Sequence, residues 1–315
     1  MSCAVSAKSL RPLTSKEARV LKPLRKLTVI CLIVAYLLAI ASCSGYSHEQ
    51  VIESEPGLLT ATFIDVGQGD SILIETPSGK TMLVDGGERA AGDKVVEVLR
   101  ERGIQRIDVV VATHPHADHI GGLITVLQRL PVDIVYDSAK PHSSKTYEDY
   151  LRLIYDKDIS FRSARAGDEI VLDDSVKISV LWPPRTDAGD PFHIENLSVN
   201  NASVVLYISF GDTTLLLTGD IEALVEEEMI RKGSAPEAQV LKVAHHGSST
   251  SSSSDFISMV RPEIAVICAA RDNIYGFPHW ETVRLLIYMG CKILMTETHG
   301  TFALQSDGKT WTVNP

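Results

Sequence analysis

Apolar residues follow two spacings along residues 58–315, and these spacings predict strands mixed with helices. Helical spacing predicts helices at about 92–102, 119–130, 146–156, 221–232, 253–260 and 280–290. Short β-branched and apolar runs between turn-forming residues predict strands at about 58–66, 71–76, 80–85, 107–112, 133–136, 169–172, 176–181, 203–210, 213–218, 239–243, 264–268, 291–296, 301–305 and 310–313. Hairpin-like pairs and strand–helix units together predict an α/β fold: an αββα sandwich of two mixed β-sheets face to face with helices outside.

Residues 1–43 differ in composition from the rest of the chain. Seven Lys or Arg and one acid precede an uncharged apolar run, 27–42, that ends in small residues before Cys43. This order is typical of a bacterial export signal. Lipid attachment at Cys43 is one interpretation, and an uncleaved N-terminal membrane anchor is the other. Both predict an exported, membrane-attached protein, with residues 44–57 as a tether and 58–315 as the folded domain.

Net charge limits the partners of the folded domain. The whole chain carries −10, and its first 43 residues contribute +6, which leaves −16 on residues 44–315. A strongly acidic domain does not attract duplex nucleic acid by bulk charge. Cleavage of single strands or small phosphodiesters remains compatible with this charge.

Four metal-ligating side chains fall within six residues, in the order H-x-H-x-D-H at His114, His116, Asp118 and His119. An apolar strand precedes them and an apolar helical segment follows. His114 and His116 are two apart on extended chain and point to the same side, whereas Asp118 and His119 open the helix and can face a second ion. Imidazoles with a carboxylate suit zinc, manganese or iron. The alternative is a surface loop that is rich in His and Asp by chance.

Three other predicted strands also end on candidate ligands. Asp220 follows the run 215–219, His245 and His246 follow 240–244, and Asp85 follows 81–84. Each signal alone is weak, because an Asp after a strand is often a turn or helix cap. Combined with the cluster, they predict a binuclear site in which an aspartate bridges two cations roughly 3.5–4 Å apart.

With these residues the chain resembles the metallo-β-lactamase-fold hydrolases and, more narrowly, the metallohydrolase domain of the ComEC competence proteins. The resemblance runs from about residue 58 to the C-terminus. The matching segments are Phe63–Ser71, Asp85–Gly87, His114–His119, Asn200–Leu206, Thr218–Asp220, Lys242–Ser248 and Asn273–His279. The resemblance implies a metal-dependent hydrolase of the metallo-β-lactamase fold, acting as a phosphodiesterase or nuclease with two divalent ions, zinc or manganese.

We expect the residues of such a site to share three roles. The predicted metal ligands are His114, His116, Asp118, His119, Asp220 and one of His245 or His246, with His245 preferred at the strand end. Asp85 and Asp65 are predicted to accept hydrogen bonds from ligand imidazoles, and Asp70 either does the same or turns its loop. Candidates for contacting a phosphate are Lys242, Asn273, Tyr275 and His279, of which His279 joins Asp118 and Asp220 as a catalytic candidate. Lys242 could instead be a solvated strand residue.

Two positions depart from the pattern of the resembled proteins. Many of them carry a further metal-binding His between the cluster and the bridging Asp, where this chain has Asn200, Asn201 and Ser203. One ion would then have fewer protein ligands. Phe277 stands where a His is expected.

Three functions are compatible with the sequence. The first is hydrolysis of a phosphodiester, from nucleic acid or a small molecule, by a hydroxide that two cations activate. The second is hydrolysis of another ester, a thioester or a lactam on the same fold. The third is a non-catalytic, metal-stabilised surface lipoprotein. A membrane is the partner that residues 1–43 predict, and no protein partner is indicated.

Overall fold

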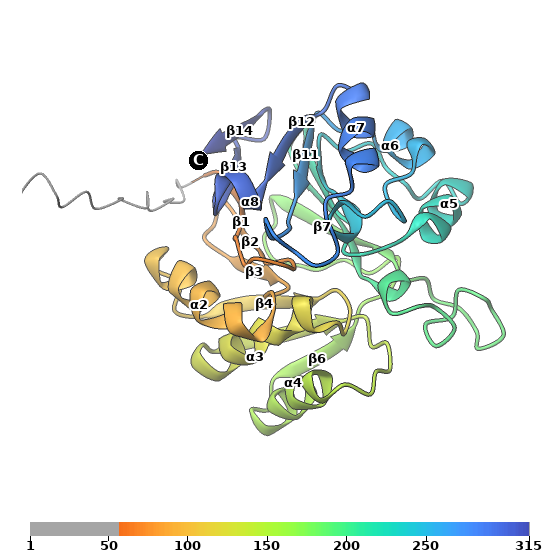
Figure 1. The fold of residues 1–315 in the computed structure, drawn as a ribbon. Coiled ribbons are helices and arrows are strands. Elements are labelled where there is room, and N and C mark those ends of the chain that lie inside the picture. The colour runs from red at the N-terminus through yellow and green to blue at the C-terminus, as the bar shows by residue number, and fades with distance from the viewer. Residues whose placement is uncertain (1–56, 315) are drawn as a thin grey trace, which may run out of the picture. The chain divides into compact units, whose positions relative to one another are not determined.

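Two β-sheets lie face to face in the computed structural model, which describes residues 57–314 (Figure 1). The predicted export segment, and all of the tether except residue 57, lie outside the described residues. Among the helices of residues 57–314, none combines the length and the apolar character that a bilayer span requires. The predicted arrangement of two mixed sheets with helices outside is confirmed.

The first sheet has eight strands in the order β14-β13-β1-β2-β3-β4-β5-β6. Pairing is antiparallel from β14 to β3 and parallel from β3 to β6. The strands are β1 (Leu59–Phe63), β2 (Ile72–Glu75), β3 (Thr81–Val84), β4 (Ile107–Ala112), β5 (Val132–Asp137), β6 (Ser160–Ser163), β13 (Phe302–Ser306) and β14 (Trp311–Asn314).

The second sheet has six strands in the order β12-β11-β10-β9-β8-β7. Strands β9 to β12 are parallel, and β7, β8 and β9 pair antiparallel. The strands are β7 (Val176–Trp182), β8 (Val205–Phe210), β9 (Thr213–Leu217), β10 (Val240–Lys242), β11 (Ile264–Ile267) and β12 (Lys292–Met295).

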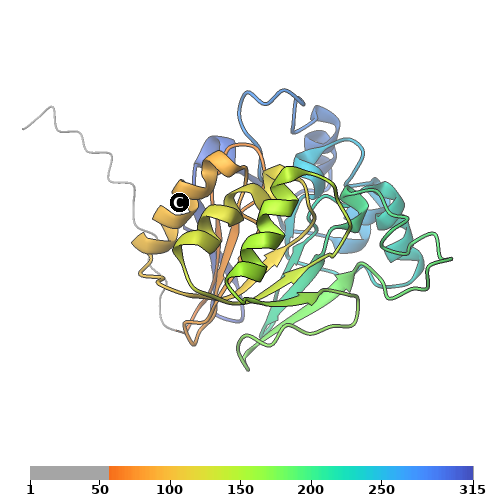
Figure 2. The ribbon, with the colours of Figure 1, turned by 90° about the horizontal axis from the view of Figure 1, so that it is seen from below.

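Helices cover the outer face of each sheet, as Figures 1 and 2 show. Apolar side chains of α2 (Gly92–Glu101), α3 (Ala117–Arg129) and α4 (Lys145–Asp156) pack on the first sheet. Those of α5 (Ala223–Arg231), α6 (Ser254–Val260) and α7 (Trp280–Tyr288) pack on the second. A short helix, α8 (Thr296–His299), and three 3₁₀ turns complete the elements: η1 (Arg89–Ala91), η2 (Asn200–Ala202) and η3 (Ala244–Gly247).

The core explains why the central strands are apolar on both faces. In β4, Val109 and Val111 face the other sheet, whereas Val110 and Ala112 face the helices. Successive side chains of a strand point to opposite faces, so a strand covered on both sides must be apolar throughout. The continuous run in β4 therefore brings the chain directly from a buried strand to His114.

Two expectations for the strands are wrong. Residues 169–172 form no strand and contribute only an isolated bridge between Glu169 and Ser179. Strand β6 was not predicted, because its four exposed residues, Ser-Phe-Arg-Ser, lack an apolar pattern. It is an edge strand, and its pairing to β5 comes from the backbone rather than from side-chain burial.

Candidate metal centre

The candidate ligands come from three strand ends that belong to both sheets. His114 and His116 follow β4, and Asp118 and His119 lie in the first turn of α3. Asp220 follows β9, and His246 follows β10 in the turn η3. A backbone hydrogen bond from Val204 N to Thr113 O, 2.9 Å long, joins the two sheets beside the site.

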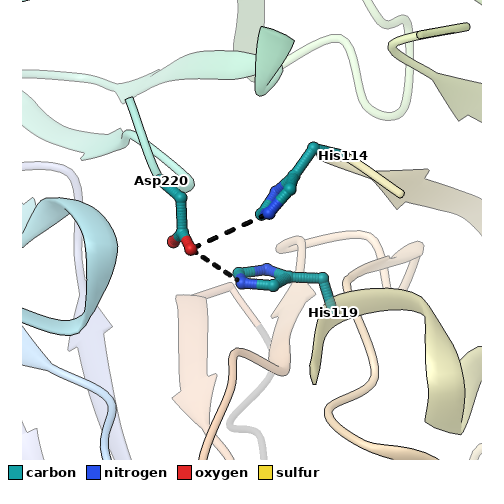
Figure 3. Close-up of side chains that lie close together, drawn as sticks. All are labelled: His114, His119 and Asp220. Atoms are coloured by element: carbon teal, nitrogen blue, oxygen red, sulfur yellow. Dashed lines mark ion pairs between the residues drawn. The ribbon is translucent and has the colours of Figure 1, made fainter. Parts of the chain in front are cut away.

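The Asp220 carboxylate lies at the centre of the cluster. Its Oδ2 is 3.2 Å from His119 Nε2, 3.3 Å from His246 Nε2 and 3.8 Å from His114 Nε2. Figure 3 shows His114 and His119 directed at this oxygen. All four side chains are at least 98% buried. The structure therefore brings together residues that lie far apart in the sequence.

Hydrogen bonds on the far side of the rings fix which nitrogen faces Asp220. His119 Nδ1 lies 2.8 Å from Asp85 Oδ2, and His246 Nδ1 lies 2.8 Å from the carbonyl oxygen of Cys268. Both partners only accept, so in the neutral rings the hydrogen is on Nδ1. Each Nε2 then presents a lone pair to the space that holds the Asp220 oxygen.

His114 is oriented in the same way by two hydroxyl groups. Its Nδ1 lies 3.1 Å from Thr113 Oγ1 and 3.2 Å from Ser203 Oγ. Thr113 donates its own hydrogen to Asp85, and Ser203 accepts one from the backbone N of Asp220. Both oxygens can therefore accept from Nδ1, which leaves a lone pair on the Nε2 of His114.

The donor atoms fall into overlapping groups, and His114, His119 and Asp220 form the first. His114 Nε2 is 3.0 Å from His116 Nδ1, close to the ~3.3 Å between two nitrogens of one tetrahedral zinc ion. The second group is Asp118, His119 and His246, in which Asp118 Oδ2 is 3.5 Å from His246 Nε2. These His and Asp clusters are consistent with the binuclear site predicted from the sequence.

Three of the donor atoms have no hydrogen-bond partner among the described residues, and this fits a site for metal ions. Within residues 57–314, His119 Nε2, His246 Nε2 and Asp220 Oδ1 are buried and make no hydrogen bond. Buried polar atoms without partners are rare because each costs free energy. Lone pairs that converge on a carboxylate require a positive charge among them. Imidazole and carboxylate groups are the donors that zinc and manganese accept.

Neighbouring carboxylates shift the pKa values of two of the ligand histidines, His119 and His246. Burial lowers the pKa of His119, but the charges of Asp220, Asp85 and Asp118 outweigh burial and raise it well above its usual value. The pKa of His246 is raised in the same way, mainly by Asp220. Burial lowers the pKa of His114 well below its usual value. The site thus favours a cation at His119 and His246, either a proton or a metal ion.

Asp70 and Lys242 form a buried ion pair beside the ligands. Lys242 Nζ contacts Asp70 Oδ2 and lies 3.9 Å from Asp220 Oδ1. Asp70 Oδ1 is in turn 3.5 Å from His246 Nδ1. Lys242 is completely buried, so the alternative in which it is a solvated strand residue is wrong, and it does not line the cavity described below. Of the two options for Asp70, the structure shows the one in which its carboxylate lies beside a ligand imidazole, that of His246.

Gly69 lets this part of the chain approach the start of α3. Its φ is +117°, and a Cβ there would lie 1.9 Å from the backbone oxygen of Asp118. The backbone N of Asp70 donates to the same oxygen over 3.3 Å. Only glycine permits this contact. The glycine therefore fixes Asp70 and Asp118 on either side of His246.

Two other expectations about single residues need correction, those for His245 and Asp65. His246, and not the preferred His245, reaches Asp220, because both residues have positive φ and the tight turn directs only His246 inward. Asp65 binds Gly67 N and Lys94 rather than an imidazole. Asn273 and His279 are not among the described residues that line the cavity below. They bind loop backbone, Asn273 at Ala270 and Phe277 and His279 at Ser249, and their contact with a phosphate stays a prediction.

A cavity of about 330 Å³ opens over the ligands. Tyr275, a predicted substrate contact, lies on its rim. The lining residues are Gln68, Glu88, His116, Ala117, Asp118, Asp220, His245, His246, Tyr275 and Phe277. Gln68, Glu88, Thr113 and the orienting role of Ser203 were not predicted. Gln68 lies inside the segment Phe63–Ser71, which is one of the segments that carry the resemblance. Its place in that segment could have identified it as a site residue, whereas a glutamine by itself could not.

Asn200, Asn201 and Ser203 stand where many of the resembled proteins have a further metal-binding His, and the structure shows what each of them contacts. Ser203 Oγ bridges His114 Nδ1 and the Asp220 backbone, so it orients the site instead of extending it. Asn200 lies at the neighbouring edge, where its Nδ2 is 3.4 Å from His245 Nε2. Asn201 supports the loop after Asp220 by accepting from Glu222 N.

Relatives of known name match most of this chain. ComE operon protein 3 of Bacillus subtilis (strain 168) is 30% identical over 302 residues, which cover 90% of this chain and 36% of that protein. Competence protein ComA of Neisseria gonorrhoeae is 30% identical over 265 residues, which cover 84% of this chain and 34% of that protein. The chain therefore spans about a third of the length of the curated relatives that it matches.

A solved structure and a family profile agree with the fold. CmlA, a diiron β-hydroxylase from Streptomyces venezuelae, superposes with a TM-score of 0.50 at 15% identity, covering 79% of this chain and 54% of that chain. At this identity the likeness concerns the fold alone. The profile described as "Metallo-beta-lactamase superfamily" matches residues 64–271. The chain therefore belongs to the metallo-β-lactamase superfamily, as a domain related to the ComE operon protein 3 and ComA competence proteins.

Proposed function

We propose that this protein is a metal-dependent phosphodiesterase or nuclease, exported and attached to a membrane. The observation that carries the proposal is the single Asp220 oxygen within 3.8 Å of three imidazole nitrogens whose other nitrogens are already bonded. One relative is named Competence protein ComA, and another, at 29% identity, is named Recombination protein 2. These names favour a phosphodiester of nucleic acid as the substrate.

The chain itself would bind and orient the reacting groups. His114, His116 and Asp220 would hold one ion, and Asp118, His119 and His246 would hold the other with Asp220 between them. Two divalent ions there would supply a hydroxide nucleophile at neutral pH and compensate negative charge on the phosphoryl group.

The surrounding residues would keep these ligands in place. Asp85 and the Cys268 carbonyl keep the rings of His119 and His246 in the binding tautomer. Lys242 balances the charge of Asp70 beside the site. No Ser or Cys nucleophile is required for this chemistry.

A substrate panel tests the proposal. The full chain, purified in detergent with Zn²⁺ or Mn²⁺, is assayed on single-stranded DNA, duplex DNA, bis-p-nitrophenyl phosphate, a phosphorylcholine ester, a thioester and a cephalosporin. We expect hydrolysis of the phosphodiesters, and its loss in Asp118→Ala and His119→Ala variants that remain folded. Unchanged turnover of bis-p-nitrophenyl phosphate in both variants would contradict the mechanism. Turnover of the thioester or cephalosporin alone would replace the proposed substrate class.

Attachment to the membrane is tested separately. Fractionation of cells that make the full chain should place it with membranes, facing away from the cytoplasm. Replacing Cys43 by Ser should release it if a lipid at Cys43 is the anchor. Retention of the variant in the membrane would favour the uncleaved helix, and recovery of the unmodified chain in the cytoplasm would contradict export.

A further inference from the structure

Two aromatic rings stand at the rim of the metal cavity. The rings of Tyr275 and Phe277 are stacked, with centroids 5.4 Å apart and planes 18° from parallel. Both residues line the cavity together with Asp118, Asp220 and His246. Phe277 packs towards the core of the second sheet, while Tyr275 is 58% exposed. The outer ring of the pair is therefore accessible from the cavity mouth.

The loop that carries these rings is fixed in position. The Asn273 side chain accepts hydrogen bonds from Tyr275 N and Phe277 N, and it donates to the backbone oxygens of Ala270 and Phe277. A side chain bonded at four points holds a turn in one conformation. The ring platform is thus organised before any ligand arrives.

The same loop is tied to the turn that carries the ligand His246. His279 N donates to Gly247 O over 3.0 Å, and His279 Nδ1 accepts from Ser249 N over 2.9 Å. The Phe277 ring centroid lies 6.1 Å from that of His246. The distance between the rings and the metal ligands is therefore set by the fold.

The charge of the cavity lining indicates what the rings would recognise. Among the described residues that line it, none is Lys or Arg, and three are acidic: Glu88, Asp118 and Asp220. A phosphodiester could be held there by ions at the ligands but not by basic side chains. Recognition of the rest of the substrate would then fall on uncharged contacts, and stacked aromatic rings bind planar bases irrespective of their identity.

We propose that Tyr275 and Phe277 form a stacking platform for a nucleobase next to the phosphodiester that is cleaved. This proposal rests on the proposed function and narrows its substrate to single-stranded nucleic acid, because the bases of a duplex are already stacked on one another. Phe277 supplies the inner ring of the pair, at the position where the resembled proteins suggest an imidazole.

A pair of oligonucleotides with equal charge tests the platform. Binding of fluorescent oligothymidylate to the full chain is compared with binding of an abasic oligonucleotide of the same length, with Ca²⁺ as the added ion. We expect the wild-type protein to bind oligothymidylate about tenfold more tightly. Tyr275→Leu should abolish this preference while keeping apolar volume, and Tyr275→Phe should keep it. Phe277→Leu, checked for folding by circular dichroism, should weaken it.

The outcomes separate the platform from the catalytic proposal. Equal wild-type affinity for the two oligonucleotides, or an undiminished preference in Tyr275→Leu, overturns the platform. A further measurement follows KM and kcat with Mn²⁺, where Tyr275→Leu should raise KM for oligothymidylate and leave kcat within about twofold. If no phosphodiester is hydrolysed although the base preference is present, the proposed function fails and the platform stands as a binding site.

Discussion

His119 donates the hydrogen of its Nδ1 to Asp85 Oδ2 over 2.8 Å, and both side chains are fully buried. The same carboxylate accepts from the backbone N and the hydroxyl of Thr113. Asp85 thereby joins the strand end before His114 to the helix start at His119. One residue outside the ligand set thus orients the metal centre.

Asp85→Asn should weaken metal binding by about 10- to 100-fold. An asparagine places an NH₂ group beside His119 Nδ1, which would force the ring hydrogen onto Nε2 and remove the lone pair that faces Asp220. Competition with a chromogenic chelator measures the affinity. Asp65→Asn is the matched control, because Asp65 binds Lys94 and loop backbone instead. Equal affinity in the two variants would refute the orienting role.

Variants of the adjacent residues His245 and His246 should differ in the number of metal ions that they bind. His246→Ala should lower the bound metal by about one ion per chain, because His246 Nε2 lies 3.3 Å from Asp220. His245→Ala should retain both ions, since His245 faces Asn200 and Thr250. Elemental analysis after dialysis against a metal buffer gives the count. Loss of an ion from His245→Ala alone would reverse this assignment.

Lys242→Met should destabilise the metal-free protein by about 3–5 kcal/mol, since it leaves the buried carboxylate of Asp70 without its cation. Urea unfolding in the presence of a chelator measures the free energy. Lys80→Met serves as the control, because Lys80 pairs with Asp108 at the surface and such pairs contribute about 0–1 kcal/mol. Similar losses of unfolding free energy in both variants would show that the buried pair of Lys242 and Asp70 contributes no more to stability than a surface pair.

Asp137 should make stability fall with rising pH. Burial raises its pKa to about 6, although bonds from Ala139 N and nearby tyrosine hydroxyls favour the carboxylate. A raised folded-state pKa gives stability that is complete below about pH 4 and lost as the pH rises through 6. The gap of roughly two pKa units corresponds to about 3 kcal/mol. The free energy of unfolding of wild type minus Asp137→Asn should therefore drop by this amount from pH 4 to 7. A flat difference over that range would refute the prediction.

The sequence alone determined the layers of the fold and most of the ligand set. Continuous apolar runs such as β4 require cover on both faces, so they predict buried parallel strands without any tertiary information. Because the four ligands from His114 to His119 are close together in the sequence, they lie at one strand end wherever the other ligands come from. Strand ends at Asp220 and Asp85 then suggested further ligands, because ends of parallel strands meet at one edge.

Only the tertiary structure decided between neighbours and assigned roles to charged residues. His245 and His246 share residue type and strand end, and the left-handed turn in which both lie directs only His246 to Asp220. Lys242 resembles a solvated strand residue until Asp70, from a distant loop, lies against it. Asp65 and Asp85 each follow a strand, yet only Asp85 meets an imidazole. Local pattern sets which side of a strand is buried, but the identity of a buried polar group's partner depends on contacts between segments remote in the chain.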